Sequence, residues 1–79
     1  MKVGEFLKKK RQVNGLTTRS LGEKAEVSFA YVSQLERGVC NPTLDTLDRL
    51  LKALDVGWIE FLTATGYVKP SKSRARLKP

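Results

Sequence analysis

The sequence lacks histidine and contains a single cysteine, Cys40. Histidine is the commonest metal ligand and the side chain that most often acts as an acid or base near neutral pH, so little remains for hydrolytic or zinc chemistry. Cys40 has no partner cysteine for a disulfide bond and no evident positive neighbour, which favours an ordinary free thiol. We therefore expect no enzymatic activity, no metal site and no cofactor.

Long apolar runs are absent as well. No stretch of about 20 apolar residues could span a membrane, and the opening MKVGEFLKKK has no apolar segment after its first charge that would act as a signal peptide. These absences predict a cytoplasmic protein without a membrane partner, and no small-molecule ligand is evident. A chain of 79 residues predicts one compact domain, residues 1–67, with no room for an effector domain.

Acidic residues are too few to balance the basic ones. The chain has 15 Lys and Arg against 8 Asp and Glu, a net charge of +7. Five basic residues and no acidic ones lie within residues 69–79, so 7 minus 5 leaves +2 for residues 1–68. This distribution suits nucleic acid, although charges that only keep a small protein soluble would account for it equally well. We expect residues 68–79 to form a flexible basic tail that adds salt-sensitive affinity.

The sequence does contain a regular succession of helix signals. Apolar residues recur at helical spacing, while glycine, proline and capping residues separate the segments. No segment shows the sustained alternation of a β-strand. The pattern predicts an all-α fold of five helices: residues 3–13, 18–25 and 29–37, a fourth that begins after Thr43 with an apolar stripe of Leu44, Leu47, Leu50, Leu51 and Leu54, and a fifth from 58 to about 65.

The fifth segment carries more apolar surface than a short helix can bury. One stripe, Ile59 and Leu62, is predicted to face the core, which leaves Trp58, Phe61 or Tyr67 at least partly exposed. Exposed aromatic surface of this kind often marks an interface, and we expect a two-fold homodimer through these three residues. The alternative is that the aromatic side chains fold back and complete a monomeric core.

The segments at 18–25 and 29–37 are joined by only three residues, Glu26, Val27 and Ser28. Two short helices with so brief a connection are typical of a helix-turn-helix, in which the second helix can enter the DNA major groove. A corner of two helices is a weak indication by itself, because many all-α proteins contain one.

A longer stretch is more specific. LTTRSLGEKAEVSFAYVSQLERGVCNPTLDTLDRLLKALDV resembles the lambda-repressor-like DNA-binding domains of the Cro and XRE regulator family, over roughly residues 3–66. The resemblance implies a five-helix bundle, usually dimeric, that binds double-stranded operator DNA and regulates transcription, and we expect a repressor. Two residues depart from the family pattern: Glu26 stands where glycine is frequent in the turn, and Gly22 stands where alanine is usual.

The resemblance also implies roles for individual residues. Gln34 can pair with adenine through its amide, whereas Phe29 and Ala30 can offer only apolar contacts, for which the thymine methyl group is the obvious target. An A·T-leaning site is therefore expected. The base-facing positions are Phe29, Ala30, Ser33 and Gln34. The positions near the DNA backbone are Thr18, Arg19, Ser28, Arg37 and Asn41.

Several of these residues have a second reading. Phe29 could be a packing residue, Arg19 a solvated side chain and Asn41 a turn residue before proline, while Ser28 caps its helix in either case. The family further implies a structural ion pair between Arg11 and Glu36.

A different class of function remains open at this point. The same fold could serve as a protein-interaction module through Phe29, Tyr31, Trp58 and Phe61. The few polar groups on the segment at 29–37 favour this alternative, and the basic ends of the chain disfavour it.

Overall fold

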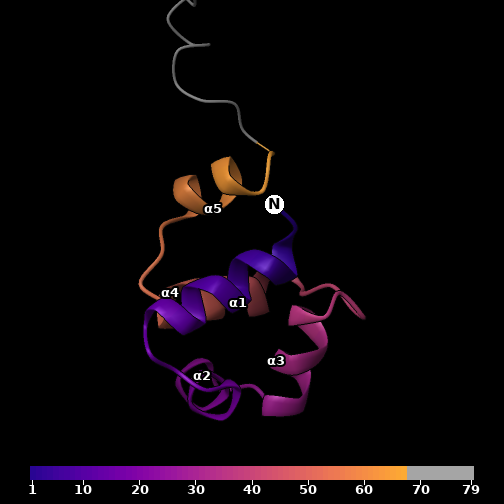
Figure 1. The fold of residues 1–79 in the computed structure, drawn as a ribbon, viewed down its shortest axis with the longest axis vertical. Coiled ribbons are helices and arrows are strands. Elements are labelled where there is room, and N and C mark those ends of the chain that lie inside the picture. Colours follow the sequence, from indigo (N-terminus) through magenta and orange to yellow (C-terminus); the bar gives the residue numbers. More distant parts are fainter. Residues whose placement is uncertain (68–79) are drawn as a thin grey trace, which may run out of the picture.

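The computed structural model describes residues 1–67, which form five α-helices and no strand (Figure 1). The helices are α1 (Val3–Val13), α2 (Thr18–Ala25), α3 (Phe29–Glu36), α4 (Leu44–Ala53) and α5 (Trp58–Ala64). The all-α prediction is confirmed, and α3 ends one residue earlier than predicted because Arg37 is its C-terminal cap. The expected basic tail, residues 68–79, lies outside the described residues.

Side-chain caps determine where three of the helices begin. Each cap residue is extended, and its hydroxyl oxygen accepts a hydrogen bond from the backbone N–H three residues later, at 3.0–3.2 Å. Such a bond satisfies one of the N–H groups that have no partner within the helix, and its loss typically costs about 1 kcal/mol. The three caps are Thr17 for α2, Ser28 for α3 and Thr43 for α4.

All five helices contribute to one core. The predicted leucine stripe of α4 is buried except for Leu44, which lies in the first turn beyond the core and is 76 % exposed. Gly4 lets α1 approach α3 closely, because a Cβ atom there would collide with the carbonyl oxygen of Leu35. The buried apolar residues are Phe6, Leu7, Leu21, Ala25, Val32, Leu35, Leu47, Leu50, Leu51, Leu54, Val56 and Phe61.

The packing of α5 corrects the sequence prediction. Phe61 is only 2 % exposed and packs edge-on against Phe6, with ring centroids 5.3 Å apart, whereas Ile59 is 71 % exposed. The prediction that Ile59 and Leu62 face the core was therefore wrong for Ile59, whereas Leu62 is half-buried against the core. Phe61, predicted to lie at the dimer surface, is buried instead. Helical spacing shows which residues share a face, but the contact with α1 decides which face turns inward. Phe61 consequently cannot form part of a dimer surface or of a protein-binding surface.

Polar contacts also hold α5 in place. The indole N–H of Trp58 donates to Asp48 Oδ1 of α4 at 2.9 Å, and Lys10 Nζ of α1 lies 2.6 Å from Glu60 Oε2. The hydrogen bond from Trp58, together with the nearby Lys52 ammonium group, lowers the pKa of Asp48. Trp58 is half-buried, so part of its ring packs within the fold and part of it is exposed to solvent.

The turn between α2 and α3 accommodates both departures from the family pattern. Glu26 adopts a left-handed conformation, with φ 62° and ψ 43°, at a cost on the order of 1–2 kcal/mol relative to glycine. The next residue packs back on α2, where Val27 N donates to Gly22 O at 2.9 Å. A Cβ atom on Gly22 would lie 2.6 Å from Val27 O, so the close contact expected at Gly22 is present.

Candidate nucleic-acid interface

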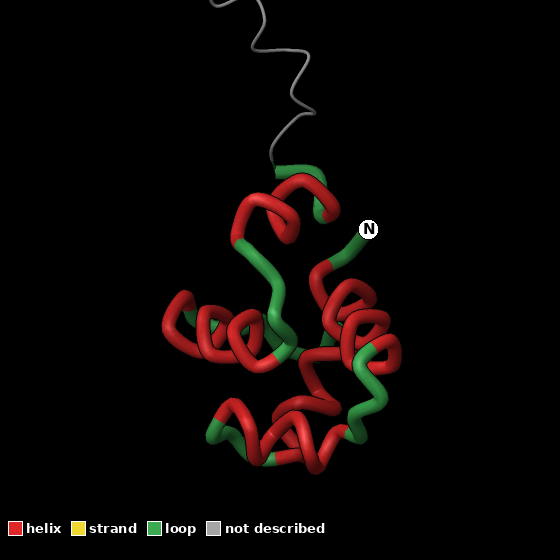
Figure 2. Tube along the Cα trace, turned by 90° about the vertical axis from the view of Figure 1, so that its left-hand side faces the viewer, coloured by secondary structure: helices red, strands yellow, loops and turns green. Residues whose placement is uncertain are grey.

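Helices α2 and α3 form the end of the body opposite α5 (Figures 1 and 2). Helix α3 is anchored from behind by Val32 and Leu35, which are 1 % and 2 % exposed. Of the four predicted base-facing residues, Phe29, Ala30 and Gln34 are exposed and Ser33 is half-buried. The structure thus brings these four residues to one outward face of α3, which a rigid core supports.

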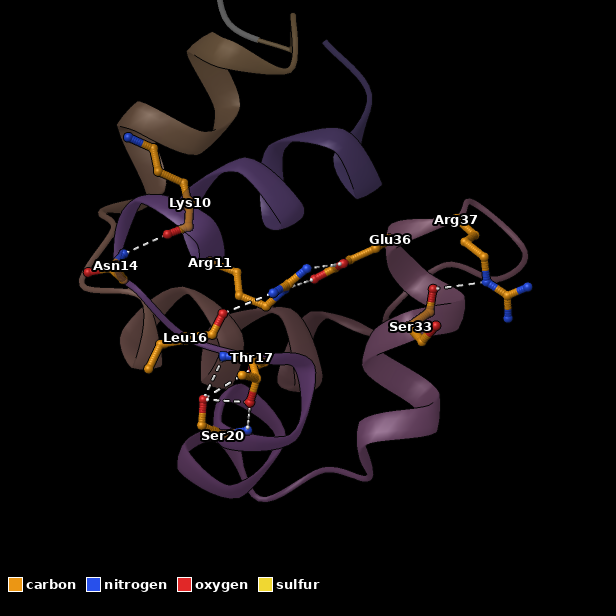
Figure 3. A network of polar contacts seen from close by, with 9 residues as sticks. All are labelled: Lys10, Arg11, Asn14, Leu16, Thr17, Ser20, Ser33, Glu36 and Arg37. Atoms are coloured by element: carbon orange, nitrogen blue, oxygen red, sulfur yellow. Dashed lines mark hydrogen bonds and ion pairs between the residues drawn. The ribbon is translucent and has the colours of Figure 1, made fainter.

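An ion pair holds the C-terminal end of α3 against α1. Arg11 Nε lies 2.6 Å from Glu36 Oε2, and Arg11 Nη2 donates to Glu36 Oε1 at 3.1 Å (Figure 3). Arg11 Nη1 also donates to the carbonyl oxygen of Leu16, just before α2, at 2.9 Å. The side chains of Arg11 and Glu36 are 13 % and 6 % exposed, so the pair is largely removed from water. One side chain of α1 therefore braces both helices of the corner.

Four of the five residues predicted to lie near the DNA backbone are at the ends of α2 and α3, whereas the fifth, Asn41, lines a groove beside Leu44 and Tyr67. Thr18 and Arg19 are the first two residues of α2, and Ser28 and Arg37 cap the two ends of α3. Asn41 lies in the loop that leads to α4. All are exposed except Thr18, which is half-buried. The Arg37 guanidinium group points away from the body while its Nε donates to Ser33 O at 3.4 Å (Figure 3).

Arg19 and Phe29 make a contact that the sequence analysis missed. The guanidinium carbon of Arg19 lies 4.5 Å from the centroid of the Phe29 ring, and Phe29 remains 47 % exposed. No sequence pattern indicates this contact, because the two residues are on different helices and no periodicity links them. Phe29 is thus neither buried in the core nor isolated, since it forms a cation–π pair across the corner.

A second exposed surface lies at the α5 end. An apolar groove of about 280 Å³ runs beside Trp58, Leu62 and Tyr67, with Leu44 on its border. Ile59 lies three residues before Leu62, one turn away on α5, and is exposed. The predicted interface includes Trp58 and Tyr67 of this surface. Leu44, Ile59 and Leu62 were instead predicted to belong to the buried apolar stripes of their helices. We call this surface the α5 face and define it as Leu44, Trp58, Ile59, Leu62 and Tyr67.

Residues 1–67 contain neither a metal-ligand cluster nor a membrane-spanning helix. No cluster of three or more metal-ligating side chains occurs in this part of the chain. No helix within it has the length and apolar character needed to cross a membrane. Cys40 is half-buried and unpaired within the same residues.

The chain is similar to regulators of known class. A family model described as helix-turn-helix matches residues 7–61. An uncharacterized HTH-type transcriptional regulator of Mycobacterium tuberculosis is 34 % identical over 70 residues, which cover 89 % of this chain and 50 % of that protein. Another from Sinorhizobium fredii is 40 % identical over 63 residues, 80 % of this chain and 82 % of that one. The chain therefore spans about half the length of the mycobacterial relative.

Solved structures agree with the sequence relatives. The restriction-modification controller protein C.Esp1396I superposes with a TM-score of 0.74 at 30 % identity, over 80 % of this chain and 82 % of that one. A variant of that controller protein has been solved bound to its highest-affinity operator site. Since the family model covers the core and the helix-turn-helix corner, this chain belongs to the lambda-repressor-like, Cro/XRE family of helix-turn-helix regulators.

Proposed function

We propose that this chain is a sequence-specific DNA-binding transcriptional regulator, acting as a repressor, which inserts α3 into the major groove. The observation that carries the proposal is the outward face of α3, held between the core and the Arg11–Glu36 ion pair. Such rigidity is what base recognition requires, because side chains must meet base edges with hydrogen-bond precision. The family relationship supports the same function.

The proposal assigns one group of residues to the bases and another to the DNA backbone. Gln34 contacts adenine by hydrogen bonds, Ser33 adds a short polar contact, and Phe29 and Ala30 make apolar contacts with thymine methyl groups. Contacts to phosphate and sugar set the register of the protein on the duplex. They come from Thr18, Ser28, Arg37 and Asn41, whereas Arg19, predicted to join them, has its guanidinium group over the Phe29 ring. We further propose that the protein acts in the cytoplasm and has no enzymatic activity.

Removing the amide of Gln34 tests the proposal for α3. The full chain is used to select preferred duplexes from a random DNA pool, and the Kd for the selected site is then measured at two salt concentrations. Gln34→Ala should weaken binding to that site about tenfold and relax the preference for adenine opposite this residue, because a bidentate pair contributes about 1–3 kcal/mol of discrimination. Gln12→Ala, an exposed glutamine on α1, is the matched control and should change neither quantity. Binding to all duplexes with equal affinity would refute the proposed function.

We also propose that two copies of the chain associate through the α5 face. Leu44, Ile59 and Tyr67 are each at least 71 % exposed, although they are large apolar or aromatic side chains. An apolar surface at the end opposite α2 and α3 leaves both DNA-reading helices free in a two-fold dimer. Such a dimer can place its two reading helices about one turn of DNA apart.

Sedimentation at micromolar concentration tests this association. Ile59→Gln combined with Tyr67→Ser should shift the protein from dimer to monomer, because both changes remove apolar surface without touching the core. These exposed positions test the interface more cleanly than Trp58, whose loss would also remove the hydrogen bond to Asp48. Val13→Gln, another exposed apolar residue, is the control and should leave the dimer intact. A wild-type protein that sediments as a monomer at this concentration would contradict the proposal.

A further inference from the structure

We propose that Arg19 reads a guanine in the major groove and that Phe29 positions it for this contact. The inference rests on the proposed function and changes the expected site, which gains a G·C pair beside its A·T pairs. It starts from one observation: the Arg19 guanidinium carbon lies 4.5 Å from the centroid of the Phe29 ring. Phe29 is the first residue of α3, the helix that enters the groove in the proposed function.

The position of the guanidinium group distinguishes base contact from phosphate contact. An arginine that binds phosphate extends from its helix toward the DNA backbone at the edge of the groove. Arg19 instead crosses from α2 to α3 and lies over a ring at the front of the reading helix. In a helix-turn-helix, the N-terminal residues of this helix contact the base edges. In the proposed docking of α3, the charge would therefore lie beside the bases.

The contact with the ring also leaves hydrogen-bond donors free. The ring attracts the positive charge of the guanidinium group, which has five N–H donors. Among the residues that the structure describes, Arg19 has no carboxylate partner within ion-pair distance. A planar fork with free donors matches O6 and N7 of guanine, which is the commonest specific contact in the major groove. Lysine could not reproduce this planar fork.

Phe29 keeps a role of its own in this arrangement. The ring remains 47 % exposed, so its uncovered surface is available for a thymine methyl group. Arg19 and Phe29 together then read neighbouring base pairs, a guanine by hydrogen bonds and a thymine by apolar contact. Phe29 acts on the guanine only through Arg19 and is a positioning residue for that contact.

Selection from a random duplex pool tests the inference, with the full chain and four variants. The wild-type protein should enrich a guanine at one fixed position, and Arg19→Ala should lose the preference at that position alone. The Kd of Arg19→Ala for the guanine-containing site should rise 10- to 100-fold, with little change on a site in which that pair is A·T. Phe29→Leu should also weaken the guanine preference, and Phe29→Tyr should retain it because the ring is kept. Lys24→Ala removes a charge from the exposed last turn of α2 and should preserve the guanine.

Other results would overturn the inference. A phosphate contact would make Arg19→Ala lose affinity uniformly, with the guanine preference intact and the salt slope reduced by about one. A wild-type site that lacks the guanine, or a guanine preference that survives Phe29→Leu unchanged, would likewise reject it while leaving the proposed function in place. If the wild-type protein enriches no sequence at all, the proposed function fails and this inference fails with it. Melting temperatures close to that of the wild type exclude unfolding as the cause, since both side chains are exposed.

Discussion

Replacing Arg11 with alanine should lower the free energy of unfolding by about 3 kcal/mol. The change leaves the Glu36 carboxylate, whose side chain is 6 % exposed, without its charged partner. It also removes the donor to the carbonyl oxygen of Leu16. Breaking a buried ion pair from one side typically costs about 3–5 kcal/mol, because the remaining charge is neither solvated nor compensated. Urea unfolding followed by circular dichroism measures the loss.

The matched control removes both charges. Arg11→Met combined with Glu36→Leu should recover most of the lost stability, because no uncompensated charge then remains in the protein. Both proteins should retain their DNA sequence preference at temperatures where they are folded. Unchanged stability of Arg11→Ala together with weaker DNA binding would show that Arg11 is a DNA contact and that its structural role is wrong.

Replacing Phe61 with alanine should lower the free energy of unfolding by about 3–5 kcal/mol. The residue is 2 % exposed and packs against Phe6 and Trp58, with ring centroids at 5.3 Å and 5.9 Å. Its loss would open a cavity between α1 and α5, and few neighbouring side chains could move in to fill it. For a small domain this is a large part of the total stability, and much of α5 would detach.

Ile59→Ala is the matched control, because it truncates a large apolar side chain on the same helix. With Ile59 71 % exposed, the expected change is within about 0.5 kcal/mol. Urea unfolding of both variants at low protein concentration separates folding from any contribution of a dimer. The opposite order of effects would mean that α5 packs through Ile59 and Leu62, as its sequence pattern predicts.

The local features of the fold were predictable from the sequence. Caps such as Thr17 and Ser28 bind backbone N–H groups three residues later, and a glycine permits a turn at its own position. Both effects are local in the sequence, so the ends of the helices can be predicted from it. Arg11 and Glu36 are 25 residues apart in the sequence, so no local pattern indicates that they pair. The prediction of this ion pair came from the family resemblance. The exposed face of α3 followed from helical spacing together with the same resemblance.

The order of the helices and the capped starts of α2, α3 and α4 are thus determined by the sequence itself, through interactions that span three or four residues. The tertiary structure alone decided that Phe61 points inward and Ile59 outward, and that Arg19 forms a cation–π pair with Phe29. Helical periodicity relates side chains within one helix, but it does not determine how that helix is rotated against its neighbours. That rotation depends on the volumes that meet across the core, such as Phe6 against Phe61, and on contacts between separate helices.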